Sequence, residues 1–208
     1  MAESSDTSTD MTTLNRKVIL FFATAYPMPV TDTEILNFLS ELDIDTTQPQ
    51  LAQVLQELHK DGVITRDAEG AERWQMPQTE AVLEHIAKDM LENEEAQVFV
   101  QSPYVRPLLT KGFLNRHEQR FKESLTNLSP YVLAIFDVDG SAESIDELFS
   151  SLIEEMEQDD GSIAPHPEFI YWMLYPDEMI EKIEHIHQIM GSECLDELLD
   201  KLDEEEQE

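Results

Sequence analysis

The first third of this chain is best interpreted from residues 55–64, whose sequence is LQELHKDGVI. Leu55 and Leu58 lie three residues apart, so they share one face of a helix. Asp61 and Gly62 end that helix, since glycine is the usual residue just past a helix C-terminus. The β-branched residues that follow are typical of a strand. The sequence therefore predicts a helix, a tight stop and a strand in direct succession.

Two more helices are expected before this stretch and a hairpin after it. Apolar residues recur at helical spacing from Leu14 to Ala23, and the prolines of Tyr26-Pro27-Met28-Pro29 end that helix. Thr31 or Asp32 caps the second helix, with Glu34 placed for a capping box. Pro49 suits the first turn of the third helix. The hairpin is expected from residues 63–66 and 72–76, joined by a turn at residues 67–70.

Three helices, the LHKDGVI junction and a hairpin make Thr12–Pro77 resemble the winged-helix superfamily. In that superfamily such a junction joins the third helix to the first wing strand. The resemblance implies that the third helix and the wing form the contact surface, and that many relatives read DNA with it. The residues that would contact DNA or a protein partner here are Gln50, Gln53, Gln56, Arg66 and Arg73.

Charge favours a protein partner over DNA. The chain has 13 Lys and Arg against 45 Asp and Glu, a formal net charge of −32. Such a surface repels phosphates, and the third helix contains no arginine. We therefore expect a non-catalytic regulatory or adaptor protein that docks a protein partner, with a basic or mixed surface, through the acidic winged helix and a helical C-terminal domain. The alternative is a winged-helix transcriptional regulator that binds DNA in a salt-adapted, halophilic organism, whose internal salt would screen the repulsion.

One basic segment interrupts the acidity of the chain. Residues 106–122 contain a single acid, Glu118, and five of the thirteen basic residues: Arg106, Lys111, Arg116, Arg120 and Lys122. This basic island is the candidate surface for any polyanion. The acidic tail, residues 203–208, is a candidate internal partner that would cover it.

The second half predicts a smaller helical domain with one or two strands. The run Tyr131–Val138, apolar up to Phe136 and rich in β-branched and aromatic residues, is interpreted as its main strand. Amphipathic helices are expected in the basic island, from residue 141 or 144, from Pro176 and over residues 194–202. The aromatic cluster Phe169–Tyr175 is expected in the core, with exposure as an aromatic dock the alternative. The fold class is α+β, mainly helical. The expected divisions are a disordered tail (1–11), a winged helix (12–77), a linker helix (78–95), a helical α+β domain (96–202) and the acidic tail (203–208).

The chain offers few groups with the spacing of a catalytic or metal site. IFDVDGS, residues 135–141, resembles the first motif of haloacid-dehalogenase-type phosphatases, which would make Asp137 a nucleophile and Asp139 a general acid. That fold needs several more parallel strands, so a strand ending in a turn is the preferred interpretation. His185 and His187 point about 200° apart on a helix and cannot share a metal. We expect no cofactor and no metal.

The remaining signals concern location and assembly. Cys194 is the only cysteine, so no internal disulfide can form, and residues 1–10 lack the features of a secretory signal. No apolar run approaches the ~20 residues that span a bilayer. We expect a cytoplasmic protein that does not bind a membrane. The predicted helix over residues 79–92 is a candidate homodimer interface.

Overall fold

The computed structural model describes residues 6–68, 72–135, 138–158, 163–164 and 166–189. The chain divides into two compact units. Unit 1 comprises Met1–Thr110 and Ala164–Pro167, and unit 2 comprises Lys111–Ile163 and Glu168–Glu208. The sequence placed the main boundary between residues 95 and 96, so the structure assigns 15 further residues, 96–110, to the first unit.

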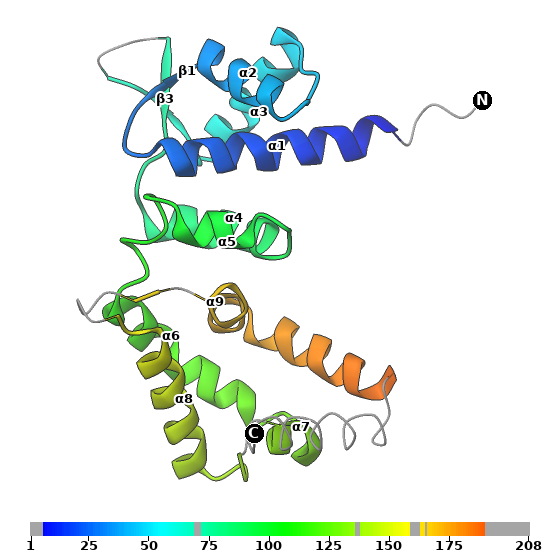
Figure 1. The fold of residues 1–208 in the computed structure, drawn as a ribbon, viewed down its shortest axis with the longest axis vertical. Helices are drawn as coiled ribbons and strands as arrows, with labels where there is room; N and C mark the ends of the chain where they lie inside the picture. The colour runs from blue at the N-terminus through cyan, green and yellow to red at the C-terminus, as the bar shows by residue number, and fades with distance from the viewer. Residues whose placement is uncertain (1–5, 69–71, 136–137, 159–162, 165, 190–208) are drawn as a thin grey trace, which may run out of the picture. The chain divides into compact units, whose positions relative to one another are not determined.

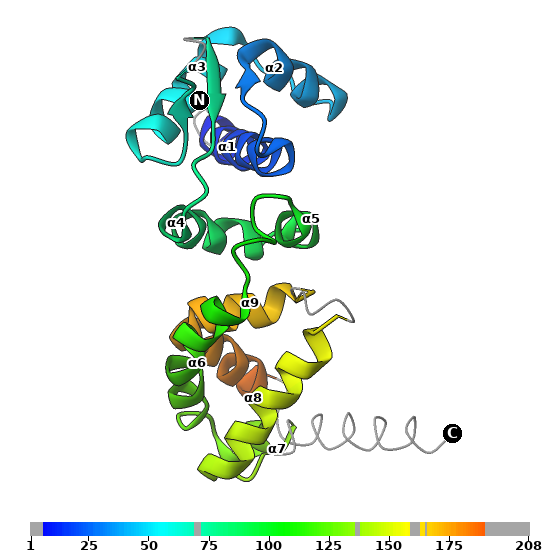
Figure 2. The ribbon, with the colours of Figure 1, turned by 90° about the vertical axis from the view of Figure 1, so that its left-hand side faces the viewer.

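Unit 1 is built around its first helix. The elements are α1 (Asp6–Ala25), β1 (Val30–Thr31), α2 (Asp32–Glu41), α3 (Gln48–Lys60), β2 (Thr65–Arg66), β3 (Arg73–Gln75), α4 (Glu80–Leu91) and α5 (Ala96–Gln101). Figures 1 and 2 show α1 between the α2–α3 pair on one side and the α4–α5 pair on the other. Because α1 has helices on both sides, apolar residues are buried on more than one of its faces. They include Val18, Ile19, Phe22 and Ala23.

A small antiparallel sheet closes one end of unit 1. Its strand order is β1-β3-β2, with Val30 opposite Trp74, and Arg66 opposite Trp74 on the other side. The hairpin expected from residues 63–76 is thereby confirmed. Strand β1 was not anticipated, because two residues are too few to show alternation.

Side-chain caps fix where α2 and α3 begin. Thr31 accepts a hydrogen bond from the Glu34 N–H, and Glu34 accepts one from the Thr31 N–H at 2.7 Å, which completes the predicted capping box. That backbone hydrogen bond lowers the pKa of the Glu34 carboxyl. Thr47 and Gln50 form a second capping box at α3. At the far end of α3, Gly62 adopts φ 76°, which few residues other than glycine tolerate.

Tyr104 explains why unit 1 continues past α5. Its ring is fully buried, and its hydroxyl lies 3.1 Å from the Pro77 carbonyl and 3.2 Å from the Thr79 carbonyl. Burial raises the pKa of this phenol to about 12, so it remains a hydrogen-bond donor. Gln78 donates to the Tyr104 carbonyl and accepts from Tyr26, which joins α1 to the same network. The chain after α5 is therefore packed on the start of α4.

Unit 2 is helical in the residues that are described. Its elements are α6 (Lys111–Leu125), α7 (Pro130–Ile135), α8 (Ala142–Met156), α9 (Pro167–Leu174, whose first residue is assigned to unit 1) and a further helix over residues 176–189. Helices α6 and α8 pack against each other (Figure 2). The β-structure described here is one isolated antiparallel bridge, Glu157 to Ile163.

Aromatic rings fill the core of unit 2. The Phe121 ring centroid lies 5.6 Å from that of Phe149, 5.5 Å from Phe169 and 5.1 Å from Trp172. Phe121 is fully buried, and the exposed fractions of the other three are 5–6%. The prediction that the cluster from Phe169 belongs to the core is confirmed for Phe169, Tyr171 and Trp172, and an exposed aromatic dock is ruled out at these three positions.

The predicted strand at Tyr131–Val138 is wrong over residues 131–135, and residues 136–137 lie outside the described chain. Residues 130–135 form helix α7, since Pro130 opens it and the Ser129 hydroxyl accepts a hydrogen bond from the Val132 N–H at 3.4 Å. A continuous apolar run of this length fits a buried helix as well as a strand. The main strand of the expected second domain is thus replaced by a helix.

The remaining expectations concern the two ends of the chain, which the structure describes only in part. The tail expected to be disordered over residues 1–11 is helical from Asp6 onward, because α1 extends beyond the apolar pattern that starts at Leu14. The helix predicted over residues 194–202, with Cys194, and the acidic tail lie outside the described residues. No described helix is long and apolar enough to cross a membrane.

Candidate functional site

The glutamines predicted to make contacts on α3 have different surroundings. Gln50 is used by the capping box, where its side-chain oxygen accepts from the Thr47 N–H at 2.9 Å and the Thr47 hydroxyl at 2.7 Å. Gln53 donates to the Glu57 carboxylate at 3.0 Å, one helical turn away. Gln56 is exposed on the same helix. Of the three, Gln56 is therefore the best placed to meet a partner.

The two arginines of the hairpin lie next to the buried Trp74: Arg66 is opposite it on β2, and Arg73 precedes it on β3. The Arg66 guanidinium lies 3.5 Å from the centroid of the Trp74 ring, a cation–π contact. Trp74 in turn donates its indole N–H to Asp32 at 2.9 Å. Arg73 is exposed and close enough to Glu34 to contribute to the lowered pKa of that carboxyl. Both arginines are exposed, and Arg66 differs in that its guanidinium stacks on the indole ring of Trp74.

The surface around α2, α3 and the hairpin is acidic. Residues 31–76 contain ten Asp and Glu and three Lys and Arg, a formal charge of −7. Reading base edges requires donors that can reach into the groove, and holding DNA requires cations at phosphates. This segment has few such cations, and Gln50, Gln53 and Arg66 already have partners within the protein.

The basic island does not form one continuous cationic surface within either unit. Arg106 belongs to unit 1, and the other four residues belong to α6 in unit 2. The Lys122 ammonium binds Glu118 at 2.6 Å and Asp146 of α8 at 2.7 Å. Burial disfavours the charge of Lys122, but these two hydrogen bonds outweigh it and raise the pKa of the ammonium.

Arg120 is paired as well, with Asp177 at 3.4 Å. The pair is exposed, so it contributes little to stability, yet it reduces the positive potential that a polyanion would meet. The island therefore helps to connect α6 to the acidic elements around it. The acidic tail proposed to cover it lies outside the described residues.

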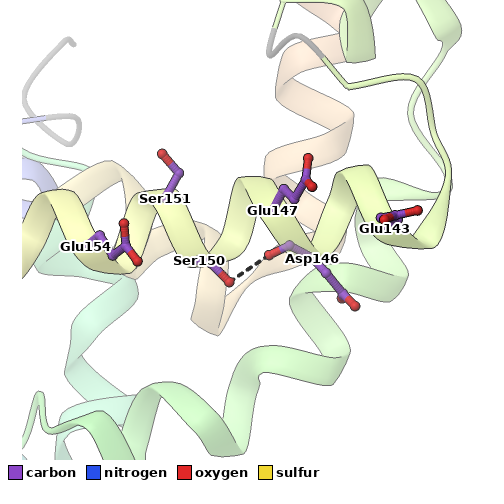
Figure 3. A pocket seen from close by; sticks show the side chains of 6 residues that line it. All are labelled: Glu143, Asp146, Glu147, Ser150, Ser151 and Glu154. Carbon is purple, nitrogen blue, oxygen red and sulfur yellow. Dashed lines mark hydrogen bonds between the residues drawn. The ribbon is translucent and has the colours of Figure 1, made fainter.

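The sequence did not single out α8, which carries a long acidic face. Its 15 residues include five carboxylates and no Lys or Arg. Figure 3 shows one side of this helix, where Ser150 donates to the Asp146 carbonyl at 2.9 Å. The residues of this face are Glu143, Asp146, Glu147, Ser150, Ser151 and Glu154. The face is visible in the sequence as carboxylates at helical spacing around two serines, but such a pattern usually marks a solvated surface.

A groove of about 290 Å³ lies where this acidic face meets α6. The buried side chains of Phe149 and Ile153 form its apolar floor. Its walls come from both helices and from the residue that caps α8: Lys111, Asn115, Glu118, Ser150, Glu154 and Glu157. The groove therefore has an apolar floor and an acidic edge. The sequence alone could not reveal it, because it depends on the packing of α6 on α8.

The catalytic and metal alternatives gain no support from the geometry. The dehalogenase-type interpretation required a strand before Asp137 and Asp139, and residues 130–135 are helical; Asp137 itself lies outside the described residues. Asp139 is exposed and accepts the Ser141 N–H at 2.8 Å, just ahead of α8. Within the described ranges, no group of three or more His, Cys, Asp and Glu could hold a metal ion.

Comparison of the chain with protein-family models, with curated proteins and with solved structures gives no match.

Proposed function

We propose that the protein is a non-catalytic adaptor or regulator whose residues 12–77 form a winged-helix domain that docks a protein partner. The order of three helices and a hairpin supports the winged-helix part of this proposal, as does the short strand β1 that completes the sheet. The docking surface would be the exposed side of α3 together with the hairpin.

One observation carries the choice of partner: three of the five groups that would read DNA already have partners on the protein's own surface. Gln50 caps α3, Gln53 holds Glu57 and Arg66 stacks on Trp74. DNA would have to displace these contacts and approach a segment of formal charge −7. A polypeptide with a basic or mixed surface meets neither obstacle.

A DNA-binding regulator in a salt-adapted cell is the second candidate. It is favoured by three exposed polar groups on α3 and the hairpin, namely Gln56, Lys60 and Arg73. High salt would screen the acidic surface and allow these groups to approach a duplex. It would also weaken the phosphate contacts on which such binding depends.

Site-specific cross-linking in the full-length chain tests the adaptor proposal. A photoreactive residue in place of Gln56 is expected to give a discrete polypeptide adduct in the native host, unchanged by nuclease treatment. The matched control is the same residue in place of Gln97, which is also an exposed glutamine but lies on α5. Adducts that vanish with nuclease, or that form equally at both positions, would contradict docking through α3.

A further inference from the structure

The groove between α6 and α8 is small and has an acidic edge. Its volume of about 290 Å³ is close to the lower end of the roughly 300–1,000 Å³ of typical ligand pockets. The floor is apolar, through Phe149 and Ile153, and two acidic side chains of the α8 end, Glu154 and Glu157, stand exposed at the edge. Such a groove has room for one or two side chains inserted from a neighbouring polypeptide.

The charges around the groove select a basic occupant. Helix α8 ends with Glu154 and Glu155, followed by Glu157 at the cap, and negative charge at a helix C-terminus opposes the helix dipole. Among the described residues, no ion pair neutralises any of these three carboxylates. Lysine or arginine from a partner would relieve both the mutual repulsion and the unfavourable dipole interaction.

Lys122, a cation between α6 and α8, already has two carboxylate partners. Lys122 binds Glu118 and Asp146 at once, and its ammonium lies 5.0 Å from the Phe149 ring centroid. It therefore holds α6 on α8 and keeps the apolar floor in place. Lys111 lines the groove at its α6 side, so a partner would place its own cations toward α8.

From these observations we propose that the α6–α8 groove binds a short basic segment of a partner protein. One apolar side chain of that segment packs on Phe149 and Ile153, and flanking lysines or arginines pair with Glu154 and Glu157. Recognition of an amphipathic segment by an apolar groove with charged edges is a recurring mode of peptide binding. The inference deepens the proposed adaptor function by giving unit 2 its own docking surface and the chemistry of its partner.

The test uses the full-length chain and three fluorescent 15-residue peptides. The probe has leucines at helical spacing among lysines; one control peptide replaces the leucines by serine and the other replaces the lysines by glutamate. Fluorescence anisotropy in moderate salt measures binding. The proposal predicts that the probe binds, that the serine peptide binds more weakly and that the glutamate peptide does not bind.

Two neighbouring serines of α8 provide a matched pair of blocking variants. Ser150 lines the groove and Ser151 does not, although both are exposed. Ser150→Trp should place an indole over the floor and weaken probe binding by about tenfold or more, and Ser151→Trp should change it by less than about twofold. Equal affinities for the two variants would overturn the proposal.

Charge variants provide a second readout that does not depend on filling the groove. Glu154→Gln with Glu157→Gln should weaken probe binding by about threefold to tenfold, in line with two partly exposed ion pairs. Glu94→Gln with Glu181→Gln removes the same charge from exposed positions elsewhere and should leave binding unchanged. If both pairs of substitutions weaken binding alike, the probe responds to overall charge and the groove is not its site. Because the groove variants, Ser150→Trp and the Glu154 and Glu157 substitutions, lie in unit 2, their failure is separate from any failure of cross-linking at α3 in unit 1.

Discussion

Replacing Phe121 by alanine is expected to destabilise unit 2 by about 3–5 kcal/mol, the usual effect of removing a buried aromatic ring. Phe121 is fully buried and its ring lies within 5.6 Å of three other aromatic rings, measured between centroids. These rings come from α8 and α9, so the substitution opens a cavity where three helices meet.

Tryptophan fluorescence can follow this effect. The chain has two tryptophans, and Trp172 lies in unit 2 beside Phe121. Denaturant unfolding of the full chain, monitored in a Trp74→Phe background, should show the Trp172 transition at much lower denaturant for Phe121→Ala. Phe121→Leu keeps much of the volume and should be milder. A loss below about 1 kcal/mol for Phe121→Ala would mean that the ring is not the centre of the core.

The second large effect is expected for Trp74→Ala in unit 1, again about 3–5 kcal/mol. Trp74 is 3% exposed, lies on the central strand β3 and donates its indole N–H to Asp32. It also carries the Arg66 guanidinium on its ring. Alanine would leave a cavity, remove one hydrogen-bond donor to Asp32 and remove the ring on which Arg66 stacks.

Hydrogen exchange measured over peptides from α1, α2 and α3 would report this loss. Protection should fall throughout these helices in Trp74→Ala. Trp74→Phe, which keeps an aromatic ring but removes the hydrogen bond to Asp32, should lose only about 1–2 kcal/mol. Exchange that remains unchanged in Trp74→Ala would show that the sheet does not support the three helices.

Much of unit 1 could be predicted because its signals are local. The capping box of Thr31 and Glu34, the proline early in α3 and the glycine at residue 62 each act within one helical turn. Their geometry depends on the backbone beside them, so the sequence reveals it directly. Strand β1 pairs with a strand more than forty residues away along the chain, so local sequence did not predict it.

The second half was harder to predict from the sequence because the contacts that determine its structure join residues far apart along the chain. The run from Tyr131 suits a strand by residue type, and the Ser129-Pro130 pair ahead of it was an unused helix-start signal. Tyr104 fixes residues 102–105 to the start of α4, about 25 residues earlier, which moved the unit boundary. Local patterns cannot show such contacts.

For the candidate sites too, local features could be predicted from the sequence and distant contacts could not. The residues at 50, 53, 56, 66 and 73 were found from the expected helix and hairpin, but their engagement with Thr47, Glu57 and Trp74 became visible only in three dimensions. The basic island was defined by sequence proximity, and Arg106 belongs to a different unit from the other four residues. Counting charges along the sequence therefore predicted a larger continuous basic surface than either unit contains.

The most direct test of the central claim is an anisotropy titration of the full-length protein against a labelled 25-base-pair DNA duplex of random sequence in low salt. Low salt favours any phosphate contact, so it gives DNA its best chance. We expect no saturable binding up to micromolar protein. Saturable binding at lower concentration that weakens on Arg73→Ala, and falls steeply with added salt, would contradict it and establish the hairpin as a DNA contact.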